Sequence, residues 1–259
     1  MIILTNREKK FFKDNGYLHL KSVIKKKKIL NFKKTFFDIL DNYSGLKTKR
    51  SFNNSDLVLK VKKFRKKNKK KFFHFFRTIS LTTSFNDLFN CDAIKDISSQ
   101  LIKTKKTNLI IGESQFRMDE PKDKFYNLDW HQDASHYKMD SKGRNSLVIN
   151  ITVQNQFKDM GTPLLKAGSH KSGIYKIYTP KGKSKVLQLK PSKKIIEINK
   201  HIIKYVNSNP GDIVIYDMKL LHKSGFNYSK KIRISVLARV FDPMNKNFKP
   251  FRYITQLLN

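Results

Sequence analysis

The sequence predicts a mainly β protein with N-terminal helices and a jelly-roll core. Two observations lead to this fold class. Residues 1–107 carry long apolar patterns with helical spacing, whereas residues 108–242 contain short β-prone runs separated by Gly, Pro, Asn and Asp. Helices followed by many short strands are typical of a β sandwich or barrel with helical support. We expect a single domain over residues 1–259, with 1–107 as mostly helical support and 108–242 as the core.

The N-terminal half is expected to contain one strand between helices. The expected elements are a helix over 5–15, a strand over 17–20, and helices over 22–43 and 85–103. Gly16 is expected to end the first helix. The candidate N-caps are Thr5 or Asn6 for the first helix, Ser22 for the second, and Ser84 or Asn86 for the last.

A dense basic run over 60–71 is followed by a phenylalanine-rich stretch over 72–77. Basic residues interleaved with aromatic ones can bind single-stranded nucleic acid through phosphate contacts and stacking. The other interpretation is an amphipathic helix whose phenylalanines pack in the core while its lysines face water. We prefer the packing interpretation, because the pairs at 72–73 and 75–76 fit one helical face.

The second half contains the runs expected to form strands. They cover residues 109–111, 147–153, 195–198, 213–216 and 232–240.

The composition limits the classes of protein to consider. The chain has 259 residues, is 39% hydrophobic and carries a formal net charge of +35. That charge indicates either an anionic partner or a lysine-rich compositional bias, and its even spread along the chain favours the bias. A single cysteine, Cys91, excludes an internal disulfide, and neither a signal peptide nor an apolar run of about 20 residues is present. We therefore expect a cytoplasmic protein that does not span a membrane.

The tripeptide His131-Gln132-Asp133 is the first candidate for chemistry. If it is extended, the imidazole and the carboxylate leave the same face of the chain and can bind one cation. A further histidine would complete the set of two histidines and one carboxylate that leaves open positions on Fe(II). His222, just beyond a strand that begins after Gly211, is the candidate. A surface pair, and a structural role for His222, are the alternatives.

Arg233 follows His222 by eleven residues, in a run that alternates between apolar and other side chains. The alternation places Ile232, Ile234, Val236, Ala238 and Val240 on one face, and Arg233, Ser235, Leu237 and Arg239 on the other. A buried arginine needs an anionic partner, and its planar fork suits a carboxylate. That partner could be a ligand, with the Ser235 hydroxyl as a second donor, or a carboxylate of the protein itself.

These motifs together resemble the phytanoyl-CoA dioxygenase family of Fe(II)/2-oxoglutarate-dependent oxygenases. The similar segments are Trp130-His131-Gln132-Asp133, Gly161-Thr162-Pro163-Leu164 with Gly168-Ser169-His170, Pro210-Gly211-Asp212, His222 with Ser224 and Asn227, and Asn15-Gly16-Tyr17. Residues 108–242 carry most of the resemblance, and residues 44–107 carry little. The sequence departs from the family at Ala167, where proline is usual, and at Glu113, where glutamine is frequent.

The resemblance implies a double-stranded β-helix, a cupin-like jelly roll, that holds Fe(II) through His131, Asp133 and His222. It implies that 2-oxoglutarate chelates the metal and that its far carboxylate binds Arg233 and Ser235. Thr152 falls where relatives often place a hydroxyl for the cosubstrate. His170 is expected to be a loop histidine, because a fourth protein ligand would block chelation and O₂ binding. His136, Tyr137, Lys138 and Arg144 either line the substrate entrance or lie in a solvated loop.

The reaction implied by the resemblance consumes 2-oxoglutarate and O₂ and oxidises a small organic molecule. Related halogenases lose the carboxylate ligand to make room for halide, so the presence of Asp133 favours hydroxylation of an aliphatic C–H group. The positive net charge mildly favours an anionic substrate. The alternative function is a nucleic-acid or anionic-surface binding protein that uses residues 60–77 on a vestigial barrel.

Overall fold

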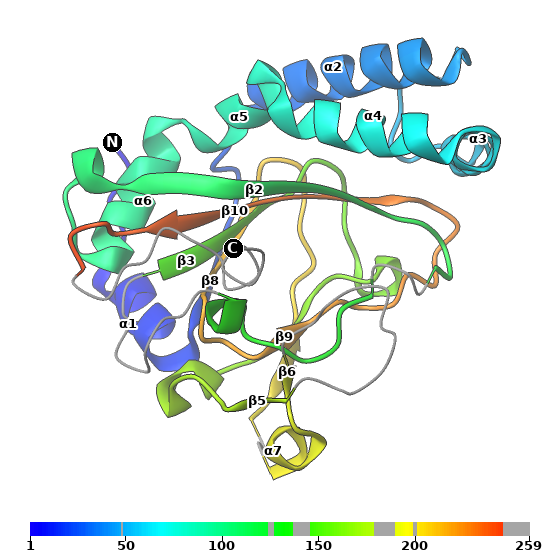
Figure 1. Cartoon of the computed structure of the whole chain (residues 1–259). Coiled ribbons are helices and arrows are strands. Elements are labelled where there is room, and N and C mark those ends of the chain that lie inside the picture. The colour runs from blue at the N-terminus through cyan, green and yellow to red at the C-terminus, as the bar shows by residue number, and fades with distance from the viewer. Residues whose placement is uncertain (48, 124–126, 137–145, 179–189, 199–200, 246–259) are drawn as a thin grey trace, which may run out of the picture.

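A five-stranded antiparallel sheet forms the centre of the computed structural model, and helices cover one of its faces (Figure 1). The structure describes residues 1–47, 49–123, 127–136, 146–178, 190–198 and 201–245. The sheet has the order β1-β8-β3-β10-β2. Its strands are β1 (Tyr17–Leu20), β2 (Ile110–Asp119), β3 (Ser146–Ile151), β8 (Ile213–Asp217) and β10 (Arg233–Phe241). The covering helices are α2 (Lys26–Ser44), α3 (Ser55–Lys67), α4 (Lys69–Leu81) and α5 (Thr83–Phe89).

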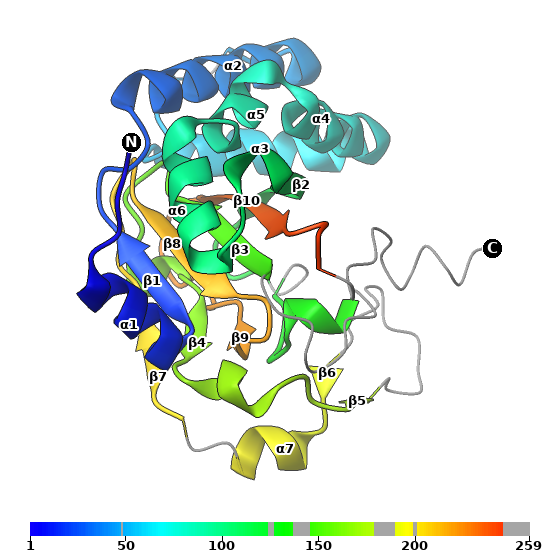
Figure 2. The ribbon, with the colours of Figure 1, turned by 90° about the vertical axis from the view of Figure 1, so that its left-hand side faces the viewer.

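Smaller sheets lie on the side of the large sheet away from these helices (Figures 1 and 2). The three-stranded sheet has the order β7-β4-β9, with β4 (Leu164–Lys166), β7 (Ile203–Tyr205) and β9 (His222–Lys223). β5 (Ile177–Tyr178) pairs with β6 (Lys190–Pro191). Two antiparallel sheets facing each other form the predicted jelly roll. The remaining helices are α1 (Asn6–Asn15), α6 (Asp92–Ile102) and α7 (Lys193–Ile198), with 3₁₀ turns η1 (Lys106–Asn108), η2 (Asp133–His136), η3 (Lys158–Met160) and η4 (Ser169–Ser172).

The two faces of the large sheet have different chemistry. On β10, Ile234, Val236 and Val240 are fully buried in the core shared with the helices, where Phe36 and Phe116 also lie. The other β10 face carries the two arginines and Ser235, as the alternation predicts, and these turn toward the smaller sheet. The helical half and the β-rich half therefore share one core, while the polar face of the sheet remains available for a site.

The first helix and strand are confirmed. Thr5 and Glu8 form a capping box at the start of α1, so Thr5 is the N-cap. Gly16 ends the helix in the left-handed region, with φ of 77°. The strand that follows pairs with β8, which adds the N-terminal segment to the edge of the large sheet.

The predicted helix over 22–43 begins later, at Lys26, and the Ser22 cap was wrong. Ser22 has φ of 53°, and its N–H donates to Asp212 Oδ1 at 2.9 Å. The helix predicted over 85–103 is two helices, α5 and α6, and the N-cap of α5 is Thr82. The Thr82 hydroxyl accepts a hydrogen bond from the Phe85 N–H, so the helix begins before the predicted caps Ser84 and Asn86.

Residues 60–77 belong to two helices that meet at Asn68. This residue ends α3 and caps α4, because its side chain accepts a hydrogen bond from the Lys71 N–H at 2.8 Å. Phe75 is buried against α2 and β2, and Phe72 is buried against Phe64 of α3. Phe73 is 64% exposed. The packing interpretation is confirmed for this segment, although the paired phenylalanines do not all share one face.

A pair of substitutions tests the packing role of this segment. We expect Phe75→Ala to lower the free energy of unfolding by about 3–5 kcal/mol, because it empties a fully buried site. Phe73→Ala, on the same helix but exposed, should change it by less than about 0.5 kcal/mol. Chemical denaturation of both variants checks this, and equal destabilisation would contradict the assigned faces.

The strand predicted over 195–198 was wrong, because these residues belong to α7. The Ser192 hydroxyl accepts from the Ile195 N–H at the start of the helix, and Ile196 packs against Trp130 and Leu164. An apolar run of four residues is too short for its spacing to distinguish a strand from a single helical turn. The other four runs overlap β2, β3, β8 and β10. None of the described helices is both long and apolar enough to cross a membrane.

Candidate metal centre

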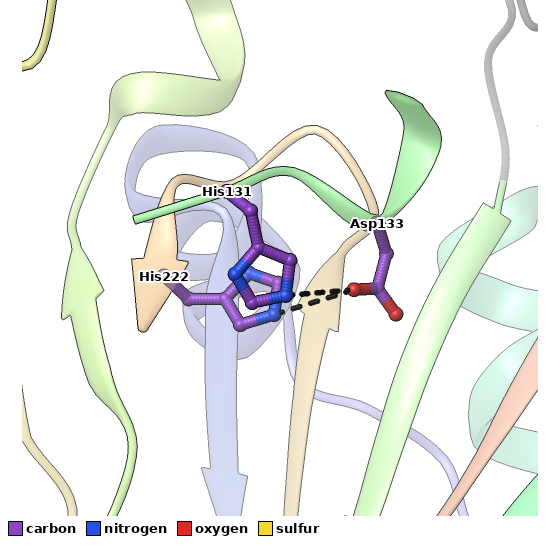
Figure 3. Close-up of side chains that lie close together, drawn as sticks. All are labelled: His131, Asp133 and His222. Atoms are coloured by element: carbon purple, nitrogen blue, oxygen red, sulfur yellow. Dashed lines mark ion pairs between the residues drawn. The ribbon is translucent and has the colours of Figure 1, made fainter. Parts of the chain in front are cut away.

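His131, Asp133 and His222 converge on one point between the two sheets (Figure 3). The Nε2 atoms of both histidines lie 3.4 Å from Asp133 Oδ1. One ligand atom from each residue falls within 4.8 Å of the other two. All three side chains are buried, and the donor set matches the facial arrangement of two histidines and one carboxylate.

The backbone explains how residues so far apart in sequence meet. His131 and His222 form an isolated antiparallel bridge, with backbone N–H to C=O distances of 2.9 and 3.0 Å. The chain then turns at Asp133 into η2 and is not extended over the whole tripeptide. The side chains of His131 and Asp133 still converge, because the turn directs the carboxylate toward the two imidazoles.

Each histidine is held with Nε2 toward the centre. His131 Nδ1 lies 2.7 Å from the Asp129 carbonyl oxygen, and His222 Nδ1 lies 2.9 Å from that of Leu220. A carbonyl can only accept, so Nδ1 carries the proton and Nε2 presents its lone pair. Burial and the neighbouring His222 lower the pKa of His131, which favours the neutral imidazole that a metal requires.

Arg239 holds the other oxygen of the candidate carboxylate ligand. Its Nε and Nη2 donate to Asp133 Oδ2 at 2.9 and 2.8 Å, and its Nη1 donates to the Glu113 carbonyl at 2.9 Å. Burial opposes the charge on Asp133, yet Arg239 and the two histidines bring its pKa well below the ordinary range. The carboxylate is therefore ionised, with Oδ1 directed at the histidines.

Gln132 lies between two candidate ligands and is fully buried. Its side-chain N–H groups donate to the carbonyls of Gly173 and Lys219, and its oxygen accepts from the Tyr175 N–H at 2.8 Å. These bonds tie the ligand segment to two other loops. The sequence marked only the outer residues of the tripeptide, because nothing in the spacing reveals these backbone partners.

The three residues open onto a cavity of about 350 Å³. Its walls come from β2, β3, β8, β9 and β10. The predicted face of β10 contributes Arg233, Ser235, Leu237 and Arg239, and the other strands and the residue after β9 contribute Gln115, Arg117, Asn150, Tyr216, Lys223 and Ser224. One side of the candidate metal position thus carries the protein ligands, and the other faces space for small molecules.

Arg233 is buried on the wall of this cavity, beside Ser235. Its Nη1 donates to Ser235 Oγ at 2.7 Å, and its Nη2 forms an ion pair with Asp119 Oδ2. Burial opposes the charge on Asp119, but Arg117 and Arg233 lower its pKa. The predicted anionic partner of Arg233 therefore includes a carboxylate of the protein. Arg233 Nε is buried and forms no hydrogen bond with the residues that the structure describes.

Thr152 lies away from the wall of the main cavity. Its hydroxyl donates to Ser208 Oγ at 2.9 Å, and it borders a separate small hollow. Two residues earlier on β3, Asn150 lines both spaces, and its buried Oδ1 has no hydrogen-bond partner among the residues that the structure describes. Asn150 is thus the β3 side chain that the structure brings closest to the predicted cosubstrate role.

The remaining motif residues have structural contacts. His170 Nε2 lies 3.1 Å from the Lys13 carbonyl, and His170 is absent from the ligand cluster, as expected for a loop histidine. Asn227 donates to the carbonyls of Asp119 and Lys231, which braces the strand end that carries the Arg233 partner. His136 lines the cavity. Tyr137, Lys138 and Arg144 lie outside the described residues.

The arginines that sequence reasoning passed over share one signal. Arg239 was placed on the polar face of β10 but received no role, and Arg117 lies on β2 two residues before Asp119. Alternation places Arg239 on the same face of β10 as Arg233, and the antiparallel pairing of β2 with β10 brings Arg117 opposite Ser235. Their partners depend on the register, which shifts between Leu237 and Arg239.

Comparison with known proteins agrees with this geometry. Residues 12–235 match the sequence profile of the family described as phytanoyl-CoA dioxygenase (PhyH). No curated protein sequence matches the chain significantly.

Solved structures share the fold at low sequence identity. EctD from S. alaskensis, with 2-oxoglutarate and 5-hydroxyectoine, is 16% identical with a TM-score of 0.66, and the match covers 96% of this chain and 79% of that chain. The epimerase SnoN, in complex with Fe³⁺, alpha ketoglutarate and nogalamycin RO, is 14% identical with a TM-score of 0.62, over 95% of this chain and 92% of that chain. EvdO2 from Micromonospora carbonacea var. aurantiaca, complexed with 2-oxoglutarate, is 12% identical with a TM-score of 0.62, over 93% and 91%.

The profile match spans most of the chain and includes the candidate ligands and both Arg233 and Ser235. The chain therefore belongs to the phytanoyl-CoA dioxygenase family of Fe(II)/2-oxoglutarate-dependent oxygenases, the family that its sequence motifs resemble.

Proposed function

We propose that this oxygenase hydroxylates an aliphatic C–H group of a small organic molecule, with Fe(II) held by His131, Asp133 and His222. The observation that carries the proposal is the convergence of these three ligand atoms within 4.8 Å at the edge of a cavity. Both imidazoles are fixed with Nε2 inward, and Arg239 holds the carboxylate through its outer oxygen. This set suits Fe(II) and leaves coordination positions on the cavity side.

Arg233 and Ser235 are proposed to bind the far carboxylate of 2-oxoglutarate. Both side chains line the cavity from the same strand, and the ion pair with Asp119 engages Nη2 of the guanidinium. Asp119 fixes the guanidinium through Nη2, and the planar fork of the side chain suits a second carboxylate. The amide of Asn150, which lines the main cavity and the small hollow beside it, is proposed as a further contact, whereas the predicted Thr152 hydroxyl borders that hollow and would have to leave Ser208 to join it.

The bound metal and cosubstrate supply the oxidation, in which 2-oxoglutarate, O₂ and R–H give succinate, CO₂ and R–OH. The protein orients these components and encloses them. Asp133 occupies the position that halide would need, which supports hydroxylation over halogenation. The cavity of about 350 Å³ supports a small molecule or the reactive end of a longer one.

Substrate-stimulated succinate formation tests this function. With Fe(II), 2-oxoglutarate and O₂, a panel of small organic acids and alcohols should contain compounds that raise succinate production, with one succinate formed per 2-oxoglutarate consumed. Asp133→Ala should reduce that production to background. A wild-type protein that neither binds 2-oxoglutarate in the presence of Fe(II) nor forms succinate with any compound would contradict the proposal.

The alternative, a nucleic-acid binding protein, is not favoured. The segment over 60–77 would need exposed aromatic rings for base stacking. Phe72 and Phe75 are in the core, and among the four phenylalanines of 72–76 only Phe73 is largely exposed.

A further inference from the structure

Lys223 lies at the junction of two cavities. It borders the metal-side cavity, next to His222, and also a larger cavity of about 620 Å³ whose lining includes one residue from each strand of the three-stranded sheet: Leu164, Tyr205 and Lys223. Ser224 is the other residue that lines both. A molecule whose reactive end reaches the metal could therefore continue past these two side chains into the larger cavity.

Two ammonium groups flank the indole ring of Trp130. Lys166 Nζ lies 5.2 Å and Lys223 Nζ 5.1 Å from the ring centroid. Lys166 is buried and donates to the Ile196 carbonyl, and both its burial and the nearby Lys223 lower its pKa. Lys223 forms no ion pair with any carboxylate of the residues that the structure describes. The two charges repel each other, and an anion beside Lys223 would relieve this.

The larger cavity combines this positive charge with partly exposed aromatic rings. Phe157, Tyr205 and Tyr228 line it and are 48%, 43% and 70% exposed. Lys158 Nζ lies 4.6 Å from the Tyr205 ring centroid, and Asp159 is the only carboxylate among the described lining residues. Exposed aromatic rings on a concave, net positive wall are suited to an organic anion with an apolar or planar part.

We propose that the substrate of this oxygenase is such an organic anion, with a carboxylate or phosphate group bound at Lys223 and its apolar part along Phe157, Tyr205 and Tyr228. This inference rests on the proposed function, because it assumes that the reactive carbon lies at the metal side. It assigns the substrate charge to Lys223 and the cosubstrate charge to Arg233, on separate walls.

Trp130 provides a direct signal for the test, because it is the only tryptophan in the chain and Lys223 lies over its ring. The protein is first saturated with Zn(II) and 2-oxoglutarate, which occupies Arg233 without turnover. Phenyl phosphate, phenylacetate or uncharged benzyl alcohol is then titrated while Trp130 emission is recorded. We expect saturable binding of at least one anion, at least about tenfold tighter than that of benzyl alcohol. Comparing phosphate with carboxylate identifies the preferred anionic group.

Lys223→Met should weaken binding of that anion at least about tenfold, whereas Lys69→Met, an exposed lysine on α4, should leave it unchanged. The proposal is overturned if neither anion binds to the wild type, if benzyl alcohol binds equally well, or if the Lys223 variant binds the anion like the wild type. Calorimetric titration of 2-oxoglutarate runs alongside. A protein that binds 2-oxoglutarate but fails these tests loses only the substrate assignment, whereas one that does not bind 2-oxoglutarate loses the proposed function itself.

Discussion

His222→Ala should lower the affinity for Fe(II) at least about 100-fold and abolish succinate formation. In other metal sites, removing a residue that hydrogen-bonds to a metal ligand lowers metal affinity or activity about 10- to 100-fold. Removing a ligand itself is expected to lower the affinity at least as much. His222 is buried, its Nε2 lies 3.4 Å from Asp133 Oδ1, and its Nδ1 is occupied by a backbone carbonyl. No neighbouring described histidine other than His131 offers a nitrogen to this point.

His170→Ala is the matched control for that result. His170 also belongs to a segment that resembles the family, Gly168-Ser169-His170. Its Nε2 lies near the Lys13 carbonyl, and it is not part of the ligand cluster. Anaerobic titration of Fe(II) into both variants should show near wild-type affinity for His170→Ala. Equal metal affinity in His222→Ala and the wild type, or loss of metal binding in His170→Ala, would show that the ligand assignment is incorrect.

Arg233→Met should weaken 2-oxoglutarate binding by about 2–5 kcal/mol, thirtyfold or more, while leaving Fe(II) affinity within about twofold. The Arg233 side chain is buried and lines the cavity from β10, whereas the candidate metal ligands lie on other segments. Arg233→Lys keeps the charge but loses the planar fork, so it should recover only part of the affinity.

An ion pair with Asp119 complicates this substitution, since Arg233 also has a structural partner. Arg117 contacts the other oxygen of Asp119 at 3.0 Å, so that carboxylate keeps a guanidinium in the variant. Circular dichroism and thermal unfolding should therefore show a folded protein. If Arg233→Met folds and binds 2-oxoglutarate like the wild type, Arg233 serves only the ion pair, and the cosubstrate lies elsewhere.

Much of the site could be predicted because it follows from period-two alternation. The sequence of β10 separates an apolar face from a face that carries Arg233, Ser235 and Arg239. The structure buries the first face in the core and places the second on the cavity wall, as expected. The candidate metal ligands were recognisable because their spacing is shared by a family, and the fold brings all three together.

Other features depend on contacts that no local pattern specifies. Arg239, which donates to Asp133, lies where the register of β10 against β2 shifts, near Glu113, whose φ is 48°. Thr152 was assigned by analogy, but its hydroxyl bonds to Ser208, a residue distant in the chain. The strand predicted over 195–198 became helical because local capping and contact with Trp130 decided a run too short to show a period.

In the helical half, too, one boundary depends on a hydrogen bond that the apolar pattern does not reveal. Asn68 divides the basic segment into two helices by capping the second, a bond that competes with continuing the first. Its lysines and phenylalanines suggested either packing or nucleic-acid binding, and only the burial of Phe72 and Phe75 separated these interpretations.

The central claim is that His131, Asp133 and His222 form one cosubstrate site together with Arg233. Anaerobic calorimetric titration of 2-oxoglutarate into the wild-type protein, with and without Fe(II), tests it most directly. A cosubstrate held by the metal at one end and by Arg233 at the other should bind at least about tenfold more tightly when Fe(II) is present. Binding of equal strength without Fe(II) would contradict the claim, because the metal residues and Arg233 would then act as separate sites.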